Sequence, residues 1–259
     1  MNENDFIIST MKWSFSRLES FYQCKYAWKK IYIDCEEKKQ NAFAQYGSLV
    51  HKLLEEYEKG VIDIFSISDE YERRFSEEVT EDFPPNKYVD MRSSYFEKGR
   101  NYLENLDLDL DEYEVLGIEK QVDFEIAGKP FIGFIDLLLK DKEGRIIILD
   151  HKSASMKWNK NNTISKTVAE KMKMYKRQLY LYAKAIIDGG NTVSFLEWNF
   201  FNDQKKYRIP FVQEEYEEAL NWAEETIKLI EQETEWLPNS TYWMCNNLCD
   251  CRCGCEFRA

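Results

Sequence analysis

The sequence has little of what marks several large protein classes. Glycine occurs only ten times and proline five times in 259 residues, whereas 15% of the residues are aromatic. This composition argues against a disordered chain and against a repeat protein. No apolar run is long enough to span a membrane, and the first ten residues carry no signal-peptide pattern. We therefore expect a soluble, cytoplasmic protein.

The chain also lacks a P-loop, the Gly-x4-Gly-Lys-Ser/Thr motif, so any motor would have to be a separate partner. It has no excess of positive charge either, since the net charge is -12. This value is unfavourable for a nucleic-acid binder, because phosphate groups bind cations. The segment from Lys152 to Arg177, however, holds eight basic residues and one acidic residue. We expect it to form a local basic face, with a solvated lysine-rich helix as the alternative.

The seven cysteines are unevenly distributed. Cys24 and Cys35 lie near the start, and five lie in the last fifteen residues: Cys245, Cys249, Cys251, Cys253 and Cys255. The odd number, the crowding and the missing secretion signal disfavour a disulfide framework. Metal ligation explains the crowding better, because neighbouring thiolates need a cation to offset their charge.

Hydrophobic periodicity predicts an α/β fold. Helices are expected from about residue 16 to 33, from near Gly47, over 167–188 and over 213–235. Strands are expected over 115–126, 131–139 and 145–150, followed by a hairpin of 192–200 and 207–212. Residues 61–111 look helical, with a break at Pro84-Pro85. The order predicts a mixed central sheet flanked by helices, as one domain over 1–259 with a helical insertion at 60–112.

Two aspartates and a lysine lie at the ends of neighbouring apolar strands. Asp136 lies in the strand Phe131–Leu139, and Asp150 and Lys152 end the next strand. Buried carboxylates are costly unless a cation compensates them, and ordinary hairpin register would bring the two aspartates together around Mg²⁺ or Mn²⁺. Lys152 lies on the same side as Asp150, two residues away. It could orient a water molecule, or it could simply form an ion pair with Asp150.

These residues resemble the signature of the PD-(D/E)XK nucleases, whose core is restriction-endonuclease-like. Gly47-x3-His51 and Gln178-x3-Tyr182 resemble two helices of the RecB-like branch, and Ser14–Cys24 resembles its first helix. The resemblance implies that His51, Asp136, Asp150 and the backbone carbonyl of His151 bind the metal ion. It also implies that Lys152 acts with Asp136 and Asp150 in catalysis, and that Gln178 and Tyr182 bind substrate. His51, Gln178 and Tyr182 could instead be packing residues. Glu119 could approach the metal from the preceding strand, but we expect it at the surface.

The resemblance extends to the cysteines. In the AddB subunit and a CRISPR-associated exonuclease, one cysteine of the first helix and three near the C-terminus hold a 4Fe–4S cluster. The corresponding residues here are Cys24, Cys245, Cys249 and Cys255. The tail spacing differs from the usual Cys-x2-Cys-x5-Cys, which leaves zinc or another choice of thiols open. We expect the tail, residues 237–259, to close onto the N-terminal helix.

The function that the resemblance implies is hydrolysis of DNA by an exonuclease in recombination, repair or phage DNA processing. A helicase or recombination protein is the expected partner, in a bacterial or phage-infected cell. A non-catalytic Fe–S or zinc subunit that binds DNA or protein is the main alternative. An unrelated metal-dependent phosphohydrolase is a third, but it would have no use for the cysteines.

Overall fold

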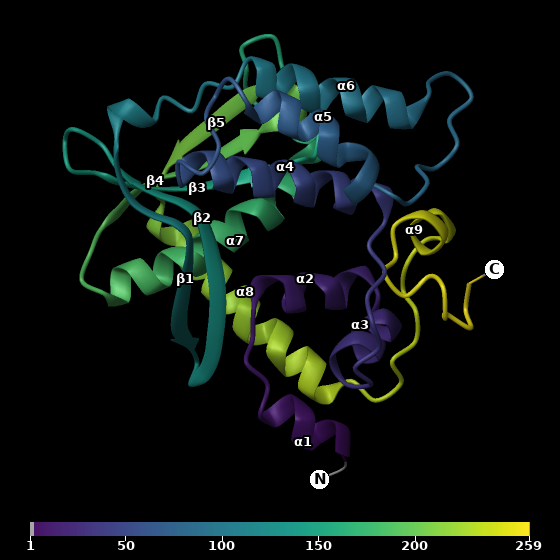
Figure 1. Ribbon diagram of the computed structural model, residues 1–259. Coiled ribbons are helices and arrows are strands. Elements are labelled where there is room, and N and C mark those ends of the chain that lie inside the picture. Colours follow the sequence, from purple (N-terminus) through teal and green to yellow (C-terminus); the bar gives the residue numbers. More distant parts are fainter. Residues whose placement is uncertain (1–2, 259) are drawn as a thin grey trace.

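The computed structural model describes residues 3–258 and confirms the predicted α/β class (Figure 1). A five-stranded mixed sheet has the order β1-β2-β3-β4-β5. Its strands are β1 (Glu114–Ile126), β2 (Lys129–Lys140), β3 (Ile146–Lys152), β4 (Val193–Phe200) and β5 (Lys205–Pro210). Neighbouring strands are antiparallel except β3 and β4, which are parallel. A parallel pair needs a long crossover, and helix α7 (Ala169–Asp188) supplies it.

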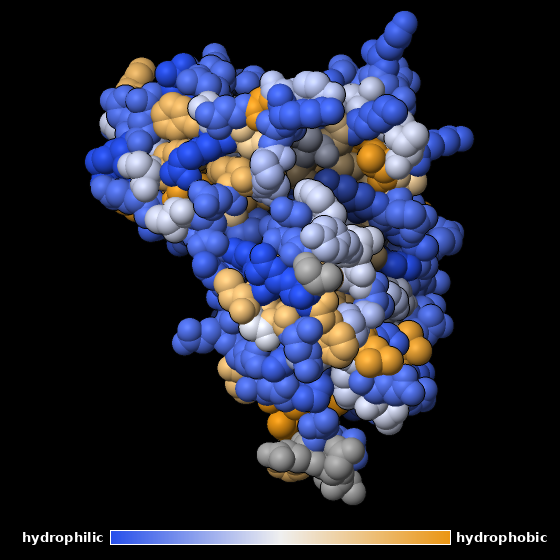
Figure 2. Space-filling view, turned by 90° about the vertical axis from the view of Figure 1, so that its right-hand side faces the viewer, coloured by the Kyte–Doolittle hydropathy of each residue, from blue (hydrophilic) through white to orange (hydrophobic). Residues whose placement is uncertain are grey.

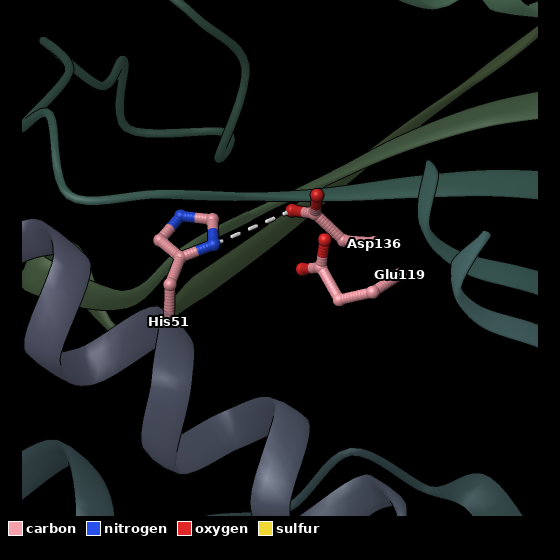
Figure 3. Close-up of side chains that lie close together, drawn as sticks. All are labelled: His51, Glu119 and Asp136. Atoms are coloured by element: carbon pink, nitrogen blue, oxygen red, sulfur yellow. Dashed lines mark ion pairs between the residues drawn. The ribbon is translucent and has the colours of Figure 1, made fainter. Parts of the chain in front are cut away.

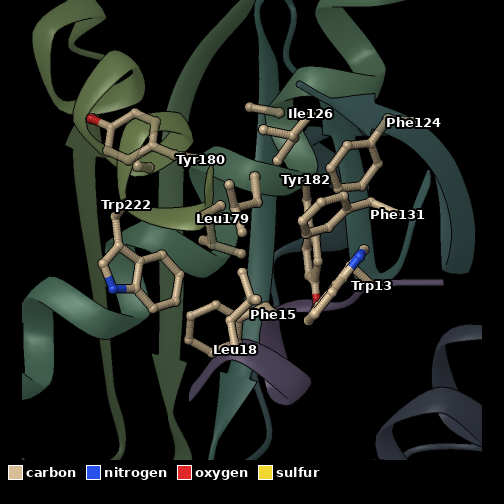
Figure 4. Close-up of a cluster of buried hydrophobic side chains, with 14 of the residues drawn as sticks. Trp13, Phe15, Leu18, Phe124, Ile126, Phe131, Leu179, Tyr180, Tyr182 and Trp222 are labelled. Carbon is tan, nitrogen blue, oxygen red and sulfur yellow. The ribbon is translucent and has the colours of Figure 1, made fainter. Parts of the chain in front are cut away.

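Helices cover both faces of the sheet, so its central strand β3 is buried on both sides (Figure 1). On one face α7 packs with α8 (Gln213–Gln232) and α2 (Phe15–Gln23) around the main core, part of which Figure 4 shows. The opposite face carries α4 (Ala42–Glu58), α5 (Ile67–Glu78) and α6 (Met91–Glu104), which have a core of their own. The remaining α-helices are α1 (Glu3–Ser9), α3 (Lys25–Tyr32) and α9 (Tyr242–Asn247).

Two predicted helices differ from those observed. The helix expected from 16 to 33 is divided into α2 and α3, because Cys24 has an extended backbone (φ -166°, ψ 112°). Its thiol accepts a hydrogen bond from the backbone N–H of Ala27 and so caps α3. The helix expected from near Gly47 begins earlier, at Ala42, where the Asn41 side chain caps it.

The surface is largely hydrophilic on the side of the molecule where α9 lies, with small hydrophobic groups among charged side chains (Figure 2). Within residues 3–258, no helix is long and apolar enough to cross a bilayer.

Candidate active site

Asp136 and Asp150 lie where strands β2 and β3 separate. The last β2–β3 pair next to them is Leu137 with Leu149, so the two aspartates occupy the next position on each strand. Both are almost fully buried, with 9% and 3% of their surface exposed. Asp136 Oδ2 accepts a hydrogen bond of 2.7 Å from the backbone N–H of His151. The structure therefore brings the two carboxylates to one end of the β2–β3 ladder.

Lys152 and Gln178 hold the Asp150 carboxylate from the α7 side. Lys152 Nζ lies 2.7 Å from Asp150 Oδ2 and donates to Gln178 Oε1 at 2.8 Å. Gln178 Nε2 donates to Asp150 Oδ1 at 3.0 Å and lies 3.4 Å from the hydroxyl of Tyr182, one turn further along α7. A side chain at Gly133 would overlap the Tyr182 ring, so this glycine permits α7 to approach β2 closely. The lysine and the two α7 side chains thus lie together around Asp150.

His51 approaches Asp136 from α4 on the other side. Its Nδ1 atom lies 3.7 Å from Asp136 Oδ2, and ligand atoms of His51, Asp136 and Glu119 all lie within 4.8 Å of one another (Figure 3). The expectation that Glu119 lies at the surface is wrong. It occupies β1 opposite Asp136, between the pairs Ile118–Leu137 and Lys120–Ile135, with a left-handed φ of 45°.

The backbone conformation explains why the sequence did not favour Glu119 as a site residue. A sequence pattern assumes that side chains alternate regularly between the two faces of a strand. Glu119 has a left-handed backbone instead, and the register of β1 against β2 shifts just before Gly117. A left-handed conformation costs a non-glycine residue roughly 1–3 kcal/mol, and such strain is concentrated at functional sites. Gly117 is the one hint in the sequence that the alternation is interrupted here.

The electrostatics of the site suit a divalent cation. Burial, and then the charge of Asp150, raise the pKa of Asp136 well above its usual range, while Lys152 and the His151 backbone act in the opposite direction. Burial, followed by the neighbouring His151, lowers the pKa of His51 to about 4, so its imidazole is neutral at pH 7. Neutral imidazole and carboxylate oxygens are suitable metal ligands.

One buried oxygen supports the same interpretation. Asp150 Oδ2 is close to the Lys152 ammonium but makes no hydrogen bond in favourable geometry. A buried carboxylate oxygen with a free lone pair is costly, and a cation beside it would remove that cost. The residues present therefore fit a bound divalent ion.

The predicted basic face is partly neutralised, because four of its eight basic residues form ion pairs, Lys152 with Asp150 among them. The acidic helix α8 lies against α7, and its Glu215 and Glu218 form ion pairs with three of the basic residues: Lys173, Lys176 and Arg177. Among the described residues, Lys157, Lys160, Lys166 and Lys171 are exposed and have no ion-pair partner. The remaining positive surface thus lies on the segment between β3 and α7 and on the first turn of α7.

The structure gathers the four cysteines that resemble cluster ligands. Cys24, Cys245 and Cys249 line one cavity of about 90 Å³. Burial raises the pKa of the Cys245 thiol, and the nearby thiols Cys24, Cys249 and Cys255 raise it further. Cys251 is hydrogen-bonded to Cys249 and lies 3.9 Å from the carbonyl oxygen of Ala27, while Cys35 and Cys253 are exposed.

Arg252 fastens the tail to the segment before α4. Its buried guanidinium donates to the backbone carbonyls of Lys39 and Gln40 and pairs with Glu81 at 2.7 Å. The side chain of Asn41, which caps α4, also donates to the carbonyl of Leu248 at 3.0 Å. The cysteine-rich tail therefore contacts both α3 and the start of the helix that carries His51.

Comparison with solved structures supports the fold. A crystal structure from Eubacterium rectale, whose name gives it only as a proposed exonuclease, covers 97% of this chain and 91% of its own, with a TM-score of 0.56 at 16% identity. At that identity the likeness shows the fold alone. The structure of SSO0001 covers 98% and 96% at 15% identity, but its TM-score of 0.36 carries no argument. No curated protein matches the chain significantly.

The match that decides the family is one of sequence. The profile of the PD-(D/E)XK nuclease superfamily matches residues 12–257, which include the whole sheet, both aspartates, Lys152 and the cysteines. This superfamily consists of metal-dependent nucleases. The chain belongs to the PD-(D/E)XK nuclease superfamily.

Proposed function

We propose that this protein is a Mg²⁺- or Mn²⁺-dependent DNA exonuclease of the RecB-like branch. The observation that carries the proposal is the meeting of two buried aspartates, a neutral histidine and a lysine where β2 and β3 separate. Hydrolysis of a phosphodiester needs a metal-held water and positive charge beside the phosphate, and this set of residues suits both needs.

His51, Asp136, Asp150 and the carbonyl of His151 would hold the metal ion, with Glu119 as a further ligand from β1. When bound, the ion would lower the pKa of a water molecule and offset negative charge on the phosphate. Lys152, oriented by Asp150 and Gln178, would place its ammonium beside the attacked phosphate and stabilise the charge that builds up there. Gln178 and Tyr182 would contact the substrate from α7.

The role of Glu119 can be tested by metal binding. We expect Glu119→Gln to lower Mn²⁺ affinity, measured by calorimetry, by at least about 10-fold, since an amide oxygen is a weaker ligand than a carboxylate. Glu125→Gln, an exposed position on the same strand, is the matched control and should leave affinity unchanged. Equal affinity of Glu119→Gln and the native protein would exclude Glu119 as a ligand.

The cysteine cluster formed by Cys24, Cys245, Cys249 and Cys255 would hold a 4Fe–4S cluster with a structural role. Four thiolates can also hold zinc, which remains the alternative. The cluster would join the start of the chain to its tail.

DNA ends are the proposed substrate, in recombination, repair or phage DNA processing, with a helicase or recombination protein as partner. Lys157, Lys160 and Lys166, on the segment that follows Lys152, would contact the DNA backbone next to the site.

The proposal is tested with end-labelled single- and double-stranded DNA in Mn²⁺. We expect release of label from linear DNA, no cleavage of closed circles, and no reaction in EDTA or with Asp150→Asn. If purified protein binds Mn²⁺ but cuts neither form of DNA, the chain is a non-catalytic subunit and the nuclease proposal fails.

A further inference from the structure

A row of buried polar side chains lies behind the active site, on the face of the sheet that α4 and α6 cover. His151, between Asp150 and Lys152 on β3, points away from both of them, because neighbouring residues on a strand alternate in direction. Its Nε2 atom lies 2.8 Å from Glu58 Oε1 of α4, and its Nδ1 atom lies 2.8 Å from Asn199 Nδ2 of β4. Only 2% of either the His151 or the Glu58 side chain is exposed.

These contacts determine which ring nitrogen carries the proton. The amide nitrogen of Asn199 can only donate, and it also donates to the hydroxyl of Tyr102 at 2.6 Å. His151 Nδ1 must therefore accept, and the neutral ring carries its proton on Nε2, which donates to Glu58. The ring is thus held from both ends in one orientation.

His151 is joined to the active site by its backbone and by its ring. Its backbone N–H donates to Asp136 Oδ2 at 2.7 Å. Its ring packs edge-on against the ring of His51, with centroids 5.8 Å apart and planes at 82°. His51 and Glu58 belong to the same helix, α4, two turns apart. A shift of His151 would therefore disturb both its backbone hydrogen bond to Asp136 and its ring contact with His51, two of the proposed metal ligands.

We propose that Glu58 is a positioning residue, which holds His151 and thereby fixes α4 and β3 in the arrangement that binds the metal ion. This inference rests on the proposed metal-dependent function. Burying a carboxylate costs free energy, and a core built only for stability would place an apolar side chain here. Groups that orient metal ligands from behind typically change metal affinity or activity by about 10–100-fold when they are removed.

The test uses the fact that the chain has only two histidines. Protein labelled with ¹⁵N-histidine gives two imidazole spin systems, and His51→Ala assigns them. We expect His151 to show the Nε2-protonated form in native protein and in Glu58→Gln, whose amide oxygen can still accept. In Glu58→Leu, where Asn199 still donates to Nδ1, we expect the tautomer to persist but the Nε2 signals to shift, because their proton has lost its acceptor. We also expect Mn²⁺ affinity and kcat to fall about 10–100-fold and KM for DNA to stay unchanged. Glu58→Gln should rescue both to within about threefold.

Glu56→Gln, two residues earlier on α4 and paired with Arg74 of α5, is the matched control and should keep native Mn²⁺ affinity and kcat. If circular dichroism shows that Glu58→Leu does not fold, Asn199→Ala removes the other hold on the ring and should lower Mn²⁺ affinity in the same way. Native affinity and kcat in a folded Glu58→Leu would overturn the positioning role and leave the nuclease proposal standing. A native protein in which Mn²⁺ neither broadens the His51 signals nor supports cleavage would overturn both.

Discussion

Lys152→Met is expected to lower the rate of DNA cleavage by about three orders of magnitude. Removing one group that stabilises charge in a transition state commonly costs about 10²–10³-fold in kcat. The methionine keeps most of the apolar length of the lysine, which lies against the Tyr175 ring with Nζ 5.1 Å from the ring centroid. The loss would therefore report the ammonium group and not the packing. Single-turnover cleavage of labelled DNA in Mn²⁺ measures it.

Lys171→Met is a matched control for this change. Its ammonium also lies over the Tyr175 ring, at 5.8 Å, but donates to the carbonyl of Ser155 and does not contact Asp150. Lys171→Met removes one positive charge close to the site, as Lys152→Met does. Because Lys171 does not contact Asp150, we expect the cleavage rate to stay within a few-fold of the native rate. Binding of both variants to DNA ends, followed by fluorescence anisotropy, should change little. A Lys152→Met protein that cuts at the native rate would exclude the proposed role of this lysine.

Cys24→Ala is expected to give the largest loss of stability. A metal-bound link from Cys24 to Cys245, Cys249 and Cys255 would close a loop over most of the chain. By analogy with long cross-links, it would stabilise the fold by about 4–5 kcal/mol. Whole proteins are stable by only about 5–15 kcal/mol. For a chain of this size we expect the Tm to fall by roughly 10–20 °C. Thermal unfolding of anaerobically purified protein measures this change.

Cys35→Ala is the matched control, because Cys35 is exposed and contacts only the carbonyl of Ile33. It should keep both the native Tm and the brown colour of an iron–sulfur protein, whereas Cys24→Ala should lose both. Native protein that is colourless and contains zinc would rule out the iron–sulfur cluster. If native protein contains no metal and Cys24→Ala has the native Tm, the four cysteines do not cross-link the chain.

Local patterns were sufficient to predict the strands in their order along the chain. The apolar run of β3 and the turns beside it predict a buried central strand. Strands joined by a short turn can pair in only a few registers. For that reason the nearness of Asp136 and Asp150 could be expected from the sequence. The break at Cys24 could not, because Ser16–Ile33 has a continuous helical pattern, and only the cap formed by the thiol distinguishes two helices from one.

Charge and long-range contacts behave differently. The basic run from Lys152 to Arg177 lost part of its free charge when α8 packed against α7, and nothing in the run itself indicates that contact. Glu119 reached the site through an irregular backbone in β1, and Glu58 reached His151 across the packing of α4 on the sheet. Neither residue belongs to a short motif.

The sequence by itself determined the α/β class, the succession of strands along the chain and the chemistry available at each strand end, because these depend on local periodicity and on residues close in the chain. The tertiary structure alone decided that Glu119 lies beside His51 and Asp136 and that Glu58 contacts His151. It also decided which lysines remain without an ion pair. Those outcomes depend on how α4 and α8 pack against the sheet. Packing of this kind is a balance of burial and shape between distant segments, which no local pattern encodes.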